Sequence, residues 1–203
     1  MLFVLTGQVQ IGKTRWLEAV LDELAAEGVP AYGVTAPGVW VPSAGPAADA
    51  NGFEKLGIDQ VLLPGGERIG FARRRDLAQA DGTYDAASQS ARAQLAWAID
   101  DTALAQVNAH LASLESRVGE DAPGLLVIDE LGRLELERDG GLTEALALLA
   151  RGPLPSWPHA LVVARARLAE VASVRFGSPW GGAQLIAPSD EGRATLRAAL
   201  SRD

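Results

Sequence analysis

The chain has 203 residues, 48% of them apolar, and a formal net charge of −8. This length suits one α/β domain with a sizeable core, and the acidic balance argues against sequence-independent nucleic-acid binding, which needs a basic face. The absence of Cys excludes disulfides, thiolate catalysis and zinc–thiolate sites, and it is compatible with the cytoplasm. No apolar run approaches the roughly 18 residues of a membrane span, and the apolar start is too short for a signal peptide, so we expect a cytoplasmic protein.

A glycine-punctuated segment follows an apolar run at the N-terminus. Leu2–Leu5 predicts a strand buried on both faces, and the next residues match the pattern G-x-x-x-x-G-K-[ST] before a helical period begins. This strand–loop–helix context is the one that a phosphate-binding loop requires. The predicted phosphate-binding residues are Gly7, Gln8, Val9, Gln10, Ile11, Gly12, Lys13 and Thr14.

Each fixed position of this glycine-rich loop has a physical purpose. Gly7 and Gly12 let successive N–H groups turn around a phosphate, and the start of the following helix adds its positive dipole end. Lys13 can reach the β- and γ-phosphates, where we expect a catalytic contribution. The Thr14 hydroxyl can ligate Mg²⁺.

The second chemical signal is Leu125–Glu130, an apolar run that ends in two adjacent acids. A buried strand with this ending has the Walker B form, in which Asp129 would hold Mg²⁺ and Glu130 would polarise the attacking water as general base. The alternative is that Asp129 caps a following helix, which would not require two acids.

Two arginines follow strands that end near these acids. Arg133 could contact a phosphate or pair with Glu135 or Glu137. Arg165 follows the predicted strand 160–164, where polar residues can sense the γ-phosphate, but it could equally be a surface residue at a helix start.

Residues 37–92 differ from the rest of the chain. Glycine and proline are dense, and short strand-like pieces predict a small antiparallel meander followed by a polar loop over 76–92. The basic run Arg73–Arg75 could be a solvated face or could approach a γ-phosphate or second substrate. We therefore expect residues 1–203 to form a single three-layer α/β domain with a mostly parallel central sheet and an inserted antiparallel meander and loop at about 37–92.

The remaining predicted elements are both strands and helices. Strands are expected at 31–36, 95–99 and 184–187, with helices at 102–117, 142–149, 167–176 and 191–200, the last capped by Asp190. The two histidines, His110 and His159, have no partner in sequence and are expected to be structural.

With both motifs in place, the chain resembles the small nucleoside-triphosphatase family of P-loop proteins, which includes a cancer-related nucleoside triphosphatase. The likeness rests on four segments: GQVQIGKT, GVTAPGV, GFEKLG with GGERIGFAR, and DELGRLEL. It implies a P-loop NTPase fold with an added strand beside the loop-bearing strand, and Mg²⁺-dependent hydrolysis of nucleoside triphosphates with little base preference. By this likeness Gly7–Thr14 would bind phosphates, Asp129 the metal, and Glu130 would be the base.

Three functions remain open from the sequence. The first is a Mg²⁺-dependent NTPase that hydrolyses the γ-phosphate of ATP, GTP or other NTPs. The second is a small-molecule or nucleotide kinase whose acceptor site is formed by residues 37–92. The third is a nucleotide-dependent switch that binds a protein partner. In each case the ligand is a nucleoside triphosphate, and neither nucleic acid nor membrane is expected as a partner.

Overall fold

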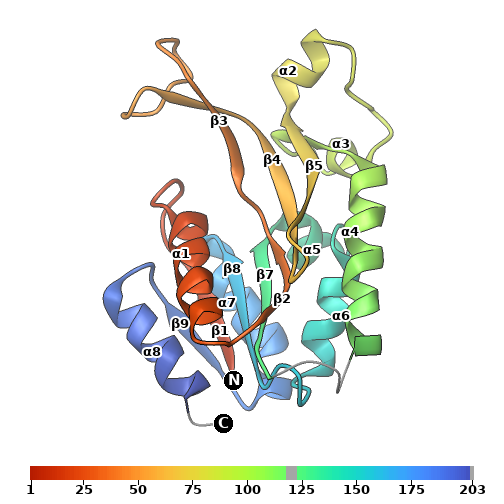
Figure 1. The fold of residues 1–203 in the computed structure, drawn as a ribbon. Coiled ribbons are helices and arrows are strands. Elements are labelled where there is room, and N and C mark those ends of the chain that lie inside the picture. Colours follow the sequence, from red (N-terminus) through yellow and green to blue (C-terminus); the bar gives the residue numbers. More distant parts are fainter. Residues whose placement is uncertain (118–122, 202–203) are drawn as a thin grey trace.

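The computed structural model describes residues 1–117 and 123–201, and in this part of the chain nine strands form one sheet (Figure 1). The strand order is β6-β5-β4-β2-β7-β8-β1-β9, with β3 paired to β4 outside this path. The strands are β1 Leu2–Leu5, β2 Ala31–Thr35, β3 Gly38–Pro42, β4 Phe53–Leu63, β5 Glu67–Arg74, β6 Trp97–Ile99, β7 Leu125–Leu131, β8 His159–Ala164 and β9 Ala183–Ile186. The α-helices are α1 Lys13–Ala26, α2 Arg75–Ala80, α3 Gln89–Arg92, α4 Asp101–Ser113, α5 Arg133–Arg138, α6 Thr143–Arg151, α7 Ala166–Phe176 and α8 Asp190–Leu200.

Strands β2, β7, β8, β1 and β9 are parallel and form the parallel half of the sheet. The apolar runs of β1, β7 and β8 are buried on both faces, as strands covered by helices on each side require. β8 lies between β1, which leads into the glycine-rich loop, and β7, which carries the two acids. The predicted mostly parallel α/β fold is therefore confirmed, including the added strand that the family resemblance implied.

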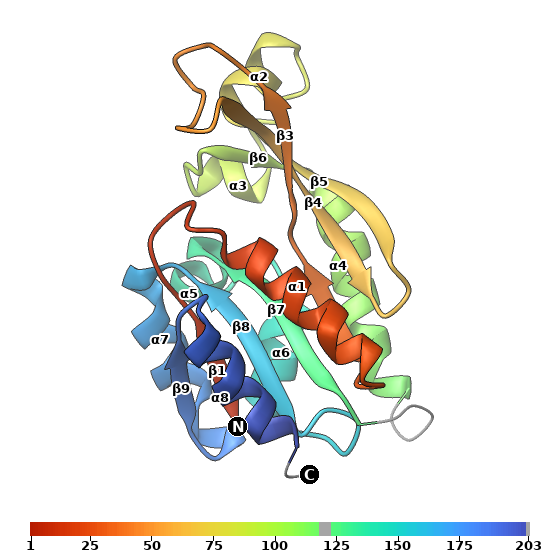
Figure 2. The ribbon, with the colours of Figure 1, turned by 60° about the vertical axis from the view of Figure 1, so that its left-hand side comes forward.

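Two apolar clusters hold the helices against this half. On one face, α1 and α8 pack through Leu17, Val20 and Leu196 against alternate residues of β1, β7 and β8. On the other face, α4, α6 and α7 cover the remaining alternate residues, so the sheet lies between two helical layers (Figures 1 and 2). No helix in the described residues is both long and apolar enough to cross a membrane.

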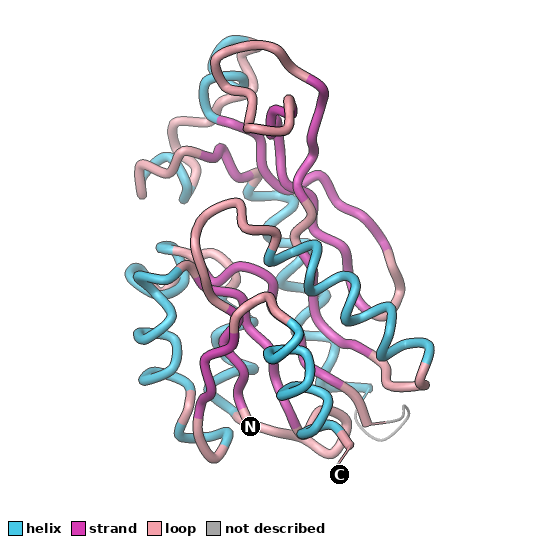
Figure 3. Tube along the Cα trace, turned by 90° about the vertical axis from the view of Figure 1, so that its left-hand side faces the viewer, coloured by secondary structure: helices cyan, strands magenta, loops and turns pink. Residues whose placement is uncertain are grey.

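Strands β3, β4, β5 and β6 form the antiparallel half, which rises above the parallel half at the end opposite both termini (Figures 2 and 3). β4 belongs to both halves, because Val61–Leu63 pairs with β2 while Phe53–Ile58 pairs with β3. The β4–β5 register shifts between Ile58 and Asp59, which marks a β-bulge in this long strand.

The strands of the predicted antiparallel meander extend the main sheet, because β4 pairs with β2. The structure corrects two expectations for other segments. Residues 76–92 are not a loop throughout, because α2 and α3 form there; both are too short to give a helical period. The residue that caps α8 is Ser189, whose side chain accepts from Gly192 N, while Asp190 is the first helical residue.

Gly33 shows how closely β2 and β7 approach. Its φ is +114°, and a Cβ at this position would lie 2.0 Å from the Val127 carbonyl oxygen. Gly33→Ala should therefore lower the free energy of unfolding by about 3 kcal/mol or leave the protein insoluble, because backbone and not a flexible side chain blocks the methyl group. Urea denaturation measures the change.

Gly65→Ala provides the matched control, because a Cβ there meets no atom within 4 Å. Equal stabilities of the two alanine variants would contradict the close approach of β2 to β7.

Candidate active site

The glycine-rich loop (Gly7–Thr14) leaves the carboxyl end of β1 and leads directly into α1. Gly7 and Gly12 have φ values of +149° and +88°, and a Cβ on Gly7 would lie 2.4 Å from Ile11 Cδ1. Gln10 also has a positive φ, 64°, although it carries a side chain. Lys13 Nζ folds over the loop and donates to Gly7 O at 3.2 Å and Gln8 O at 2.7 Å. The loop thus curls around its own lysine, the arrangement of an anion cradle at a helix start.

Asp129 stands at the carboxyl end of β7 and is only 1% exposed. Its Oδ2 accepts a hydrogen bond from the backbone N–H of Ala36 at 2.8 Å. Burial raises the pKa of Asp129 to about 6, although the Ala36 N–H and the nearby Thr14 side chain favour the charged form. Thr14 and Asp129 therefore lie beside each other in one cleft, whereas their role toward a metal stays a prediction.

Thr14 and Asp129, which line the same cleft, together offer the kind of oxygen ligands that Mg²⁺ takes from a protein. In the described residues, no three or more His, Cys, Asp or Glu side chains gather into a site that could hold a metal alone. Mg²⁺ is commonly bound through one or two protein oxygens together with substrate phosphates and water, so one hydroxyl and one carboxylate fit it without a larger cluster.

Glu130 has a φ of +78°, an uncommon backbone conformation for a residue with a side chain. Its Oε1 accepts from Arg165 Nη2 at 2.9 Å and from Arg165 Nε at 3.2 Å, so one guanidinium holds the carboxylate through two donors. Two predicted site residues from separate strand ends, Glu130 near the end of β7 and Arg165 directly after β8, thus form an ion pair. Arg133 lies elsewhere and pairs with Glu137 at 2.9 Å, which was the alternative left open for it.

A main cleft of about 480 Å³ lies between the glycine-rich loop and the antiparallel half. In Figures 2 and 3, loop 7–12 passes beneath β6 and α3. Lys13, Thr14, Asp129, Glu130 and Arg165 all line this cleft. Five side chains from the ends of β1, β7 and β8 therefore meet at one edge of the sheet, where parallel α/β folds bind their ligands.

Lys55 is a residue of this cleft that the sequence interpretation did not select. It extends from β4 between Trp40 and Trp97, with Nζ 5.9 Å and 5.2 Å from the two ring centroids. Burial lowers the pKa of Lys55, while Glu130 and Asp129 act in the opposite direction. The available signal was compositional, because Lys13 and Lys55 are the only lysines in a chain whose other cations are arginines.

The basic run Arg73–Arg75 takes no part in the main cleft. Arg73 pairs with Asp81, and Arg74 pairs with Asp76 and Glu54. The segment after β9 lies beside the first turn of α1, because Trp16 Nε1 donates to Ser189 O at 3.2 Å. Trp16 is half-buried and packs against the α1–α8 core. His110 is placed by a hydrogen bond between Nε2 and Gly33 O at 3.1 Å, away from this cleft.

The fold and the loop together define a P-loop NTPase-like α/β protein. Among solved structures, the chain is similar to the solution structure of a human cancer-related nucleoside triphosphatase, with a TM-score of 0.58, 19% sequence identity, and coverage of 99% of this chain and 95% of that one. Comparisons with protein-family models and with curated proteins gave no match. The structural similarity establishes the fold.

The burial of Asp129 leads to a stability prediction. A carboxyl group whose pKa is raised on folding, here from 3.8 to about 6, makes the folded state progressively less stable as the pH rises through that window. Asp129→Asn should therefore stabilise the metal-free protein by about 2 kcal/mol at pH 8 and by little at pH 4, where the wild-type carboxyl is protonated. Thermal unfolding with a chelator at both pH values measures the difference.

Asp22→Asn is the control, because this carboxylate is exposed on α1. If Asp129→Asn stabilises the protein at pH 8 no more than Asp22→Asn does, the buried charge of Asp129 does not carry the expected free-energy cost.

Proposed function

We propose that the protein is a Mg²⁺-dependent nucleoside triphosphatase that hydrolyses the γ-phosphate of ATP, GTP and other NTPs. The observation that carries this proposal is the position of the buried Asp129 carboxylate beside Thr14, where the end of the glycine-rich loop meets the end of β7. An ordinary βα turn gives no reason for a buried carboxylate at this position. The nucleoside triphosphatase named by the similar human structure supports the same activity.

In this proposal, the loop N–H groups and Lys13 hold the β- and γ-phosphates, and Thr14 and Asp129 hold the metal. The metal ion, when bound, neutralises charge on the phosphates. Glu130 accepts a proton from the attacking water as its oxygen bonds to the γ-phosphorus. The bond between that phosphorus and the β–γ bridging oxygen breaks, and the nucleoside diphosphate leaves with the bonding electrons.

The Glu130–Arg165 ion pair suggests how hydrolysis depends on the substrate. Arg165 lines the main cleft beside Lys13, so a bound γ-phosphate would compete with Glu130 for the same guanidinium. Transfer of Arg165 to the phosphate would free the Glu130 carboxylate to bind water. Glu130, the predicted general base, and Arg165, the predicted γ-phosphate sensor, would then be linked through one ion pair that breaks when the substrate binds.

Glu130→Gln should reduce phosphate release at least about 100-fold while triphosphate binding persists, because the amide cannot accept a proton but adds no bulk. Phosphate release and calorimetric binding of a non-hydrolysable ATP analogue with Mg²⁺ measure the two effects. Glu170→Gln, an exposed change on α7, is the control and should leave turnover unchanged. If Glu130→Gln keeps its activity, Glu130 is not the general base.

We also propose that Lys55 supplies positive charge to the γ-phosphate from the side opposite the glycine-rich loop. It reaches the main cleft from the antiparallel half, and the rings of Trp40 and Trp97 restrict its side chain. A half-buried ammonium held between two rings is already desolvated and positioned, so it would stabilise charge in the transition state with little reorganisation.

Lys55→Met should lower kcat about tenfold or more, and Lys55→Arg should restore part of it because the charge returns. Steady-state phosphate release is the measurement, and thermal unfolding accompanies it. If Lys55 had only a structural role, Lys55→Met would lower the unfolding temperature and leave the kcat of the folded protein unchanged. That result would overturn the assignment.

A further inference from the structure

A second cavity, of about 380 Å³, lies on the other side of Glu130 from the glycine-rich loop. Its wall comes from β4, β5 and β6 of the antiparallel half and from α5 and the start of α7 below (Figure 1). The apolar part of this wall is formed by Ile58, Phe71, Leu95, Ile99, Leu134 and Leu168. A volume in this range, with a mainly apolar wall, is typical of a small-molecule site.

Gln60 is the polar exception on this wall. It stands on the inner face of β4 between the buried residues Ile58 and Leu62, and it is only 2% exposed. Its Oε1 atom is buried and has no hydrogen-bond partner among the described residues. A buried acceptor without a hydrogen-bond partner destabilises the folded state, because it loses its hydrogen bonds to water and gains none in return. Such atoms are therefore rare in folded proteins. A ligand that donates a hydrogen bond to Oε1 would give this acceptor its partner.

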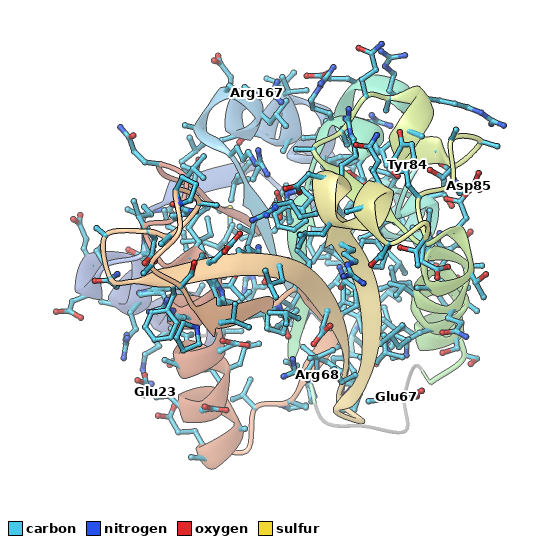
Figure 4. The ribbon with its side chains drawn as sticks, turned by 90° about the horizontal axis from the view of Figure 1, so that it is seen from above. Glu23, Glu67, Arg68, Tyr84, Asp85 and Arg167 are labelled. Atoms are coloured by element: carbon cyan, nitrogen blue, oxygen red, sulfur yellow. The ribbon has the colours of Figure 1, made fainter. Side chains whose placement is uncertain are left out.

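The charged groups around this cavity are already paired. Arg165 binds Glu130, while Arg133 and Arg167 both bind Glu137 at 2.9 Å. Glu135, which also lines the cavity, accepts from the backbone N–H groups of Gly132 and Leu142. In the view from above, Arg167 lies on α7, far from Glu67 and Arg68 at the turn of the β4–β5 hairpin (Figure 4). A charged ligand would have to break one of these pairs, whereas an uncharged ligand would not.

From these observations we propose that the second cavity binds a small, uncharged, largely aromatic molecule that donates an N–H or O–H hydrogen bond to Gln60 Oε1. The apolar wall would contact the ring, and the amide of Gln60 would fix its orientation. The cavity shares Trp97, Glu130 and Arg165 with the main cleft, so this ligand would lie directly beside the proposed γ-phosphate position. The binding itself does not depend on NTP hydrolysis.

The test compares two probes of nearly equal shape, indole, which has an N–H donor, and benzofuran, which has none. Calorimetry of the full chain without nucleotide should show that indole binds about tenfold more tightly than benzofuran. Gln60→Leu should abolish this preference, since it removes the acceptor with little change in volume. Gln60→Met serves the same purpose if the leucine variant does not fold.

Two further readouts separate this site from the proposed NTP site. Indole affinity should change less than threefold in Lys13→Ala, which would weaken only the main cleft, and the Gln60 variants should unfold at a higher temperature than wild type when no ligand is present. Absence of indole binding up to its solubility limit, equal affinities of the two probes, or an unchanged preference in both Gln60 variants would overturn the proposal. None of these results depends on whether the protein hydrolyses NTPs.

Discussion

The carboxylate of Asp129 is the point at which three parts of the fold meet. It lies near the end of β7, accepts the first N–H after β2, and lies beside Thr14 at the start of α1. Its burial makes the hydrogen bond from Ala36 necessary, because an unpaired carboxylate in this position would be expensive. The fold itself thus places the two proposed magnesium ligands beside each other.

The two halves of the sheet contribute different groups to the main cleft. The parallel half supplies the glycine-rich loop, the two acids and Arg165, all at the carboxyl ends of strands. The antiparallel half supplies Lys55 and the rings of Trp40 and Trp97 from above. A water-excluding cleft requires both halves, because the carboxyl edge of an open parallel sheet faces solvent.

Elements that depend on a local sequence pattern could be predicted correctly. Contacts between segments that are distant in the sequence could not. The apolar run Leu125–Ile128 and the glycine spacing around Lys13 predict β7 and the loop, since both signals lie within a few residues. The position of β8 between β1 and β7 was not predicted, because strand order is not encoded in periodicity, and the family resemblance implied only an added strand beside the loop-bearing strand. The pairing of Glu130 with Arg165 and the contact of Lys55 with Trp97 join residues from separate strands, and no spacing rule connects them.

The structure of β4 determines how the cleft can change its width. A hinged lid is usually joined to its domain by loops, whereas here one uninterrupted strand runs from the parallel half into the antiparallel half. Rotation about a flexible linker is therefore unavailable on this side of the molecule. Closing over a ligand would require β4 to flex, and the register shift at Ile58/Asp59 is where its ladder is already interrupted. Any change in the width of the cleft would therefore bend the strand that carries both Lys55 and Gln60.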